Sequence, residues 1–149
     1  MFQNLLIAID GSELSNKALA AGLDLAKSHG ARLTFLTATD PISTGVGSGG
    51  FGTLSAGPIV ERLEEAYREA AAKILDDASR RASEAGVSAE TVYAPRQRPA
   101  DAILQEAESR GCDTILMGSH GHRGLRRLIL GSQATEVLAR ATVPVLIIK

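Results

Sequence analysis

Short apolar runs alternate with helical patterns along the whole chain, and this alternation restricts the fold more than any other feature of the sequence. The apolar runs predict strands at Leu5–Ile9, Leu33–Ala38, Val87–Tyr93, Thr114–Met117 and Val145–Ile148. Residues at helical spacing predict helices from Leu14 to Gly30, from about Ile59 to Ala85, from Pro99 to Gly111 and from about Ser132 to Arg140. This order predicts a single α/β domain, doubly wound, in which a five-stranded parallel sheet carries helices on both faces.

Three of these segments carry more specific expectations. The run Leu5–Ile9 is apolar at every position, as expected of a central strand that is covered on both faces. Val87–Tyr93 alternates in character and is typical of a half-exposed edge strand. In the long second helix, the spacing predicts a buried stripe made of Ile59, Leu63, Ala66, Ala70, Ile74 and Ala78.

The bulk composition excludes several classes of function. A formal net charge of −1 over 149 residues argues against nucleic-acid binding, which needs a basic surface. No apolar run approaches the roughly 20 residues of a membrane span, and the first residues lack the basic region of a signal peptide. We therefore expect a cytoplasmic protein without a membrane segment. Cys112 is the one cysteine of the chain, so no internal disulfide forms, and a packed thiol is expected.

The segment between Gly118 and Ser132 joins a strand to a helix through a loop rich in glycine and arginine. Glycines let a backbone approach an anion closely, and a helix N-terminus adds unpaired N–H donors and a partial positive charge. Arg123, Arg126 and Arg127 lie in the same loop and would supply counter-charge. The segment therefore predicts a site for phosphate groups.

Two motifs at opposite ends of the chain carry a family resemblance. One is Ile9-Asp10-Gly11-Ser12 at the end of the first strand. The other is the pattern G-x2-G-x9-G-S/T, present as Gly118, Gly121, Gly131 and Ser132 and followed by a closing Val143-Pro144-Val145 strand. With these motifs, residues 1–149 resemble the universal stress protein family in its ATP-binding branch. The resemblance implies a Rossmann-like sheet of the adenine nucleotide alpha hydrolase type with strand order 3-2-1-4-5. It also implies a homodimer through Val143–Ile148.

The resemblance also implies roles for individual residues around an adenine nucleotide. Asp10 would contact the adenosine part, and Ala8 and Ala38 would line the adenine slot. Gly118 and Gly121 would lie against ribose and phosphates, and Gly131, Ser132 and the backbone N–H of Gln133 would bind phosphate. Met117, His120 and Arg123 complete the predicted site. The residues themselves leave alternatives open, because Asp10 could cap the first helix together with Ser12, and Ser132 could be an ordinary helix N-cap.

Other known motifs are either absent from the sequence or lack the neighbouring strand or ligands that they require. Gly47 to Gly52 fits the dinucleotide fingerprint G-x-G-x-x-G, but no strand precedes it directly, so we interpret the glycine-rich stretch Gly45–Gly57 as a loop that could act as a lid. His120 and His122 lack a third ligand in register, so no metal site is predicted. No Walker loop or nucleophile elbow is present.

The sequence therefore predicts a regulator that binds ATP, with Mg²⁺ held through the phosphates, and that hydrolyses ATP slowly if at all. One alternative is a hydrolase or phosphotransferase that uses the same cleft. The other is a dimeric interaction module without nucleotide.

Overall fold

The computed structural model describes residues 1–43, 57–121 and 130–149, and the chain forms nine elements in these ranges. In order they are β1 (Asn4–Ala8), α1 (Glu13–His29), β2 (Arg32–Ala38), α2 (Gly57–Glu84), β3 (Ala89–Ala94), α3 (Pro99–Ser109), β4 (Thr114–Gly118), α4 (Ser132–Arg140) and β5 (Val145–Ile148). The strands are parallel and follow the order β3-β2-β1-β4-β5, which confirms the predicted fold class and strand order. The predicted lid and the arginines of the 118–132 segment lie outside the described residues.

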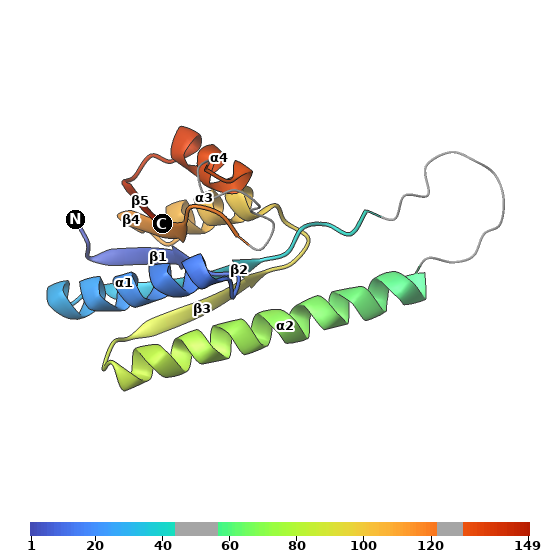
Figure 1. Ribbon diagram of the computed structural model, residues 1–149, viewed down its shortest axis with the longest axis horizontal. Helices are drawn as coiled ribbons and strands as arrows, with labels where there is room; N and C mark the ends of the chain where they lie inside the picture. Colours follow the sequence, from blue (N-terminus) through green and yellow to red (C-terminus); the bar gives the residue numbers. More distant parts are fainter. Residues whose placement is uncertain (44–56, 122–129) are drawn as a thin grey trace.

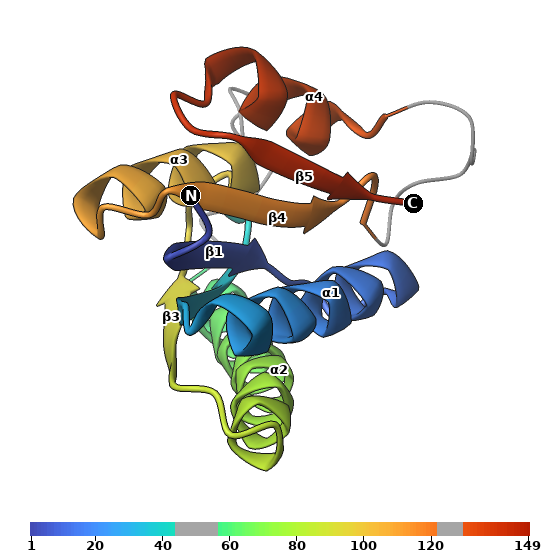
Figure 2. The same cartoon turned by 90° about the vertical axis from the view of Figure 1, so that its left-hand side faces the viewer.

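Helices α1 and α2 cover one face of the sheet, and α3 and α4 cover the other (Figure 1, Figure 2). Side chains of the central strands alternate between these layers. Leu5 and Ile7 of β1 pack with α1 and α2, whereas Leu6 packs with α3 and α4. Because both faces are covered, every position of β1 from Leu5 to Ile7 is buried, which explains its uninterrupted apolar run.

The predicted buried stripe of α2 is wrong at most of its positions. The buried residues are Ala71, Leu75, Ala78 and Ala82, so Ala78 alone of the predicted set is fully buried. Ile59 is 73% exposed and Leu63 37% exposed, because the N-terminal half of α2 projects beyond the end of the sheet (Figure 1). The helix is long enough that only its C-terminal half packs on β2 and β3.

A carboxylate ties the start of β1 to the start of β4. Asp113 accepts hydrogen bonds from the backbone N–H groups of Phe2 (3.1 Å) and Gln3 (2.8 Å) and from the Thr114 hydroxyl (2.9 Å). Burial would raise the pKa of Asp113, but hydrogen bonds from the Gln3 N–H, the Thr114 hydroxyl and the Asn4 N–H, together with the N-terminal charge, outweigh it and hold the pKa below its usual value. The two central strands are thereby fixed against each other at the end opposite the candidate site.

Two further sequence expectations can be compared with the described residues. Cys112 is buried, as predicted for a packed thiol, and desolvation raises its pKa above the ordinary value. Among the helices in the described ranges, none is both long enough and apolar enough to span a lipid bilayer.

Candidate functional site

The candidate site lies where β1 and β4 end side by side in the centre of the sheet. Their crossover connections run in opposite directions, so a crevice forms between their carboxyl ends. The chain after β1 is anchored to β2, because the Ile9 N–H donates to the Leu36 carbonyl (2.9 Å) and the Thr37 hydroxyl donates to the Ile9 carbonyl (2.9 Å). Asp10 is therefore held at a fixed place at the edge of the crevice.

The Asp10 carboxylate faces two elements at once. Its Oδ1 accepts a hydrogen bond from the Ser12 N–H (2.9 Å), and Ser12 in turn is the N-cap of α1, accepting from the Ser15 N–H (3.3 Å). On the other side the carboxylate lies against Gly121, where an added Cβ would overlap Oδ2 and lie 3.5 Å from Cγ. Asp10 thus shapes the turn into α1, as one alternative foresaw, and also reaches the loop after β4.

The loop after β4 returns to the crevice at Gly131. The Gly131 N–H donates to the Ser119 carbonyl (2.8 Å), and the Ser119 N–H donates to the Ile148 carbonyl at the end of β5 (2.8 Å). An added Cβ at Gly131 would lie 3.2 Å from the Cα of His120. The end of β4 and the start of α4 are thus in contact, although they are 13 residues apart in sequence (Gly118 to Gly131).

Gly131 is also the N-cap of α4, with an extended backbone and no side-chain hydrogen bond to the helix. Ser132 is the first helical residue, so the alternative that Ser132 is the N-cap is wrong. The first-turn N–H groups of α4 have no side-chain cap, which is the arrangement in which a helix start can accept an anion.

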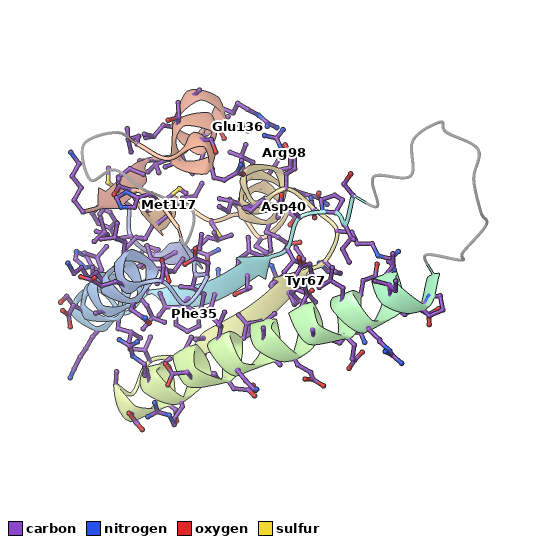
Figure 3. The ribbon with its side chains drawn as sticks, turned by 45° about the vertical axis from the view of Figure 1, so that its right-hand side comes forward. Phe35, Asp40, Tyr67, Arg98, Met117 and Glu136 are labelled. Carbon is purple, nitrogen blue, oxygen red and sulfur yellow. The ribbon has the colours of Figure 1, made fainter. Side chains whose placement is uncertain are left out.

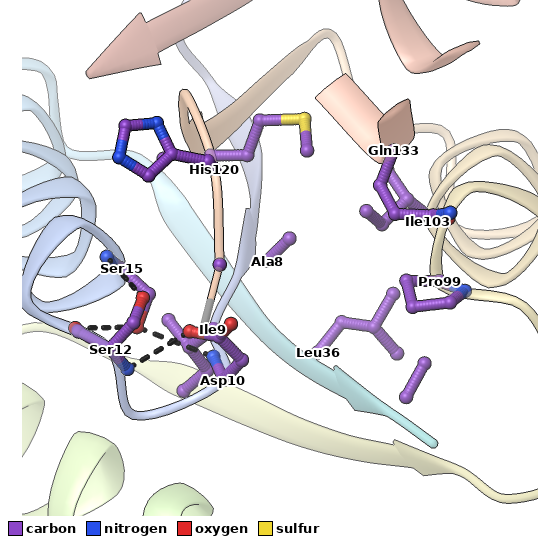
Figure 4. A pocket seen from close by; sticks show the side chains of 14 residues that line it. Ala8, Ile9, Asp10, Ser12, Ser15, Leu36, Pro99, Ile103, His120 and Gln133 are labelled. Carbon is purple, nitrogen blue, oxygen red and sulfur yellow. Dashed lines mark hydrogen bonds between the residues drawn. The ribbon is translucent and has the colours of Figure 1, made fainter. Parts of the chain in front are cut away.

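Two adjoining cavities occupy the crevice. Figure 4 shows the residues that line the first of them. The first, of about 130 Å³, lies between the ends of β1 and β2 and the start of α3, and the second, of about 460 Å³, extends toward α4. The predicted residues that line the first are Ala8, Asp10, Ala38, Met117, Gly118, His120, Gly121 and Gln133. Gly131 and Ser132 line the second. The fold therefore brings together ten of the predicted site residues, and Arg123 lies outside the described residues.

Several residues of the cavities were not singled out by the sequence. Leu36, Pro99 and Ile103 form an apolar wall of the first cavity, and Asp40 and Tyr67 line the second. Figure 3 shows Tyr67 on α2 and Asp40 on the segment that follows β2. The sequence predicted that a helix begins at Pro99. It could not predict that Pro99 lines the crevice, because this depends on how α3 packs on the sheet.

A third hollow, of about 180 Å³, shares Thr39, Asp40 and Tyr67 with the second cavity and is lined by Tyr93 as well. The hydroxyl of Tyr93 and that of Thr39 are 2.9 Å apart and hydrogen-bonded. The two tyrosines of the chain therefore lie at the same end of the sheet.

The described lining of the first two cavities contains acidic groups and no lysine or arginine. Asp10 and Asp40 are the carboxylates, and His120 lies beside the buried Ser119, with its Nδ1 3.1 Å from the Ser119 Oγ. Over the described ranges, no three His, Cys, Asp or Glu side chains gather as metal ligands would. The side-chain hydrogen-bond donors of this described lining are therefore hydroxyl, amide and imidazole groups.

The sequence matches the universal stress protein family over residues 1–149. The chain belongs to this family. It is 39% identical to universal stress protein YxiE of Bacillus subtilis, with both chains covered in full. Universal stress protein UspA from Lactobacillus plantarum has the same fold, with a TM-score of 0.85 at 21% identity over 99% of this chain and 98% of that one. A universal stress protein crystallised in complex with cAMP gives a TM-score of 0.68 at 25% identity, covering 99% and 96% of the two chains.

Within this universal stress protein, Gln133 connects two helices at the crevice. Its Oε1 accepts a hydrogen bond from the Ala100 N–H of α3 at 2.9 Å. The family resemblance assigned only the backbone N–H of Gln133 to phosphate, so this side-chain contact was not foreseen.

Proposed function

We propose that the crevice binds ATP, with Mg²⁺ held through its phosphates, and that the protein is a nucleotide-dependent regulator in the stress response. The observation that carries the proposal is the convergence of Asp10 with Gly121 and Gly131 in one lined cleft. These residues come from opposite ends of the chain, and a plain loop between a strand and a helix would not require all of them.

The two cavities suit the two ends of an adenine nucleotide. The apolar wall of Leu36, Pro99 and Ile103 can hold a base, and Asp10 can accept a hydrogen bond from a ribose hydroxyl. Beyond the base, Ser132 and the uncapped N–H groups of α4 can bind phosphate. The relative crystallised with cAMP, an adenine nucleotide, supports this ligand class.

Regulation is favoured over catalysis by the cleft lining. Phosphoryl transfer needs a residue that positions the attacking water or hydroxyl opposite the leaving group. Among the described residues that line the cleft, the imidazole of His120 is hydrogen-bonded to Ser119, and Asp10 holds the turn into α1 through Ser12, so these two groups have structural roles.

Calorimetry on the purified protein tests the proposal. We expect one ATP bound per chain, weaker binding of AMP, no heat with GTP, and adenine nucleotide in the supernatant of denatured protein. Failure to bind any adenine nucleotide would refute the proposal and favour a nucleotide-free module. Sustained phosphate release at many turnovers per minute would instead identify an enzyme.

We also propose that β5 is the edge at which two copies form a homodimer. Each of its residues is only half-buried, although all of them are large and apolar. Such an edge pairs readily with a second strand, and a two-fold axis would cover both copies at once.

A charge on β5 is expected to make the protein monomeric. Ile147→Lys would place an ammonium group in the proposed interface, and Thr91→Lys would place the same group on β3 at the opposite edge as a matched control. In sedimentation velocity, Ile147→Lys should sediment as a monomer with native circular dichroism, while Thr91→Lys stays dimeric. A wild-type protein that is monomeric at micromolar concentration would contradict the interface.

A further inference from the structure

The side-chain oxygen of Gln133 is used in a hydrogen bond within the protein. Helix α3 begins with Pro99, which has no N–H, and its N-cap residue Arg98 provides no side-chain hydrogen bond. Ala100 is fully buried, so its N–H needs a partner inside the protein. Gln133 Oε1 supplies that partner from α4 at 2.9 Å.

This bond determines what the amide can offer to a ligand. An amide has one oxygen that accepts and one nitrogen that donates two hydrogens. With Oε1 occupied by Ala100, Nε2 is the remaining group, and Gln133 lines both cavities of the cleft. Figure 4 shows Gln133 at the first cavity. An aliphatic side chain at this position would offer no donor.

Donors are valuable here because the described lining of the cleft has carboxylates but no lysine or arginine. Phosphate oxygens need hydrogen-bond donors when they leave water. We infer that Gln133 is a specificity-determining residue: its Nε2 donates to a phosphate oxygen and so selects phosphorylated adenine nucleotides over adenosine. The inference rests on the proposed function and assigns this selectivity to one side chain.

The packing of α3 on α4 does not depend on Gln133 alone, so its variants are expected to fold. Arg98 pairs with Glu136 (2.5 Å), and Arg140 pairs with Asp101 and with Glu136 (2.7 Å each). Figure 3 shows Glu136 on α4 and Arg98 at the start of α3. These pairs lie at the surface and remain when Gln133 is replaced.

Two variants distinguish the proposed donation by Nε2 to the ligand from the capping of α3 by Oε1. Gln133→Glu keeps an acceptor for the Ala100 N–H but replaces the donor with a negative oxygen. Gln133→Met removes both groups with little change in volume. Affinities for ATP and adenosine would be measured by displacement of a fluorescent adenine nucleotide, and Tm by circular dichroism.

We expect both variants to lower the affinity for ATP at least about tenfold and to change the affinity for adenosine by less than about twofold. Only Gln133→Met should lower Tm, because only it leaves Ala100 without a partner. An unchanged ratio of ATP to adenosine affinity in Gln133→Met would overturn the inference and leave Gln133 a structural cap. A wild-type protein that binds no adenine nucleotide would instead refute the proposed function.

Discussion

Gly121→Ala is expected to weaken ATP binding by about tenfold to a hundredfold while leaving the fold intact. A Cβ at this position would overlap Asp10 Oδ2, and the only other atom of the described residues within 4 Å is Asp10 Cγ. The carboxylate must therefore rotate, which breaks its bond to the Ser12 N–H and withdraws it from the proposed ligand. Loss of one hydrogen bond to a charged group costs about 1.5–3 kcal/mol, which corresponds to this range of affinity.

Calorimetry of Gly121→Ala against wild type checks the expectation. Gly86→Ala is a suitable control, because Gly86 lies between α2 and β3, far from the cleft, and no atom lies within 4 Å of its added Cβ. It has a positive φ of 70°, so alanine there should lower stability without altering affinity. Equal affinities of Gly121→Ala and wild type would show that Asp10 does not hold the nucleotide.

Gly118→Val is expected to cause the largest loss of stability, about 3 kcal/mol. A Cβ at Gly118 would lie 2.9 Å from Leu14 Cβ, 3.2 Å from the Leu14 carbonyl carbon and 3.3 Å from the Ser15 nitrogen. Two of these atoms are backbone of α1, which cannot rotate out of the way as a side chain can. The start of α1 would have to move away from β4, and Asp10 and Ser12 would move with it.

Thermal unfolding measures this effect, with an expected fall in Tm of about 10 °C. Gly22→Ala provides a comparison, because its Cβ would overlap the Cδ1 of Ile7 and lie 3.1 Å from its Cγ1, both of them side-chain atoms. Its loss should be smaller, since only side chains and no helix backbone would have to shift. If Gly118→Val unfolded at the wild-type temperature, the close approach of α1 to β4 would be wrong.

Strand positions could be predicted from the sequence because a strand that is buried on both faces has an uninterrupted run of apolar residues. Leu5, Leu6 and Ile7 are apolar without interruption, and each is fully buried. The sheet order needed the family resemblance, since no local pattern specifies which strands become neighbours. The residues that line the cleft were likewise placed by matching two motifs rather than by their chemistry.

The buried face of α2 could not be predicted, because alanines occupy three consecutive positions at Ala70, Ala71 and Ala72. Several stripes then fit the spacing equally well, and the packing on β2 and β3 selects the one through Ala71 and Leu75. The wall formed by Pro99 and Ile103 was missed for a related reason. Its position follows from the docking of α3, which depends on contacts between residues that are distant in sequence.

The place of Tyr67 and Tyr93 has a practical consequence. The chain contains two tyrosines and no tryptophan, and both rings lie around Thr39 and Asp40 at the carboxyl end of the sheet. Intrinsic ultraviolet fluorescence therefore reports on this one region and is silent about the rest of the molecule. We therefore expect binding of the proposed nucleotide to change the tyrosine emission of the native protein, without an attached dye.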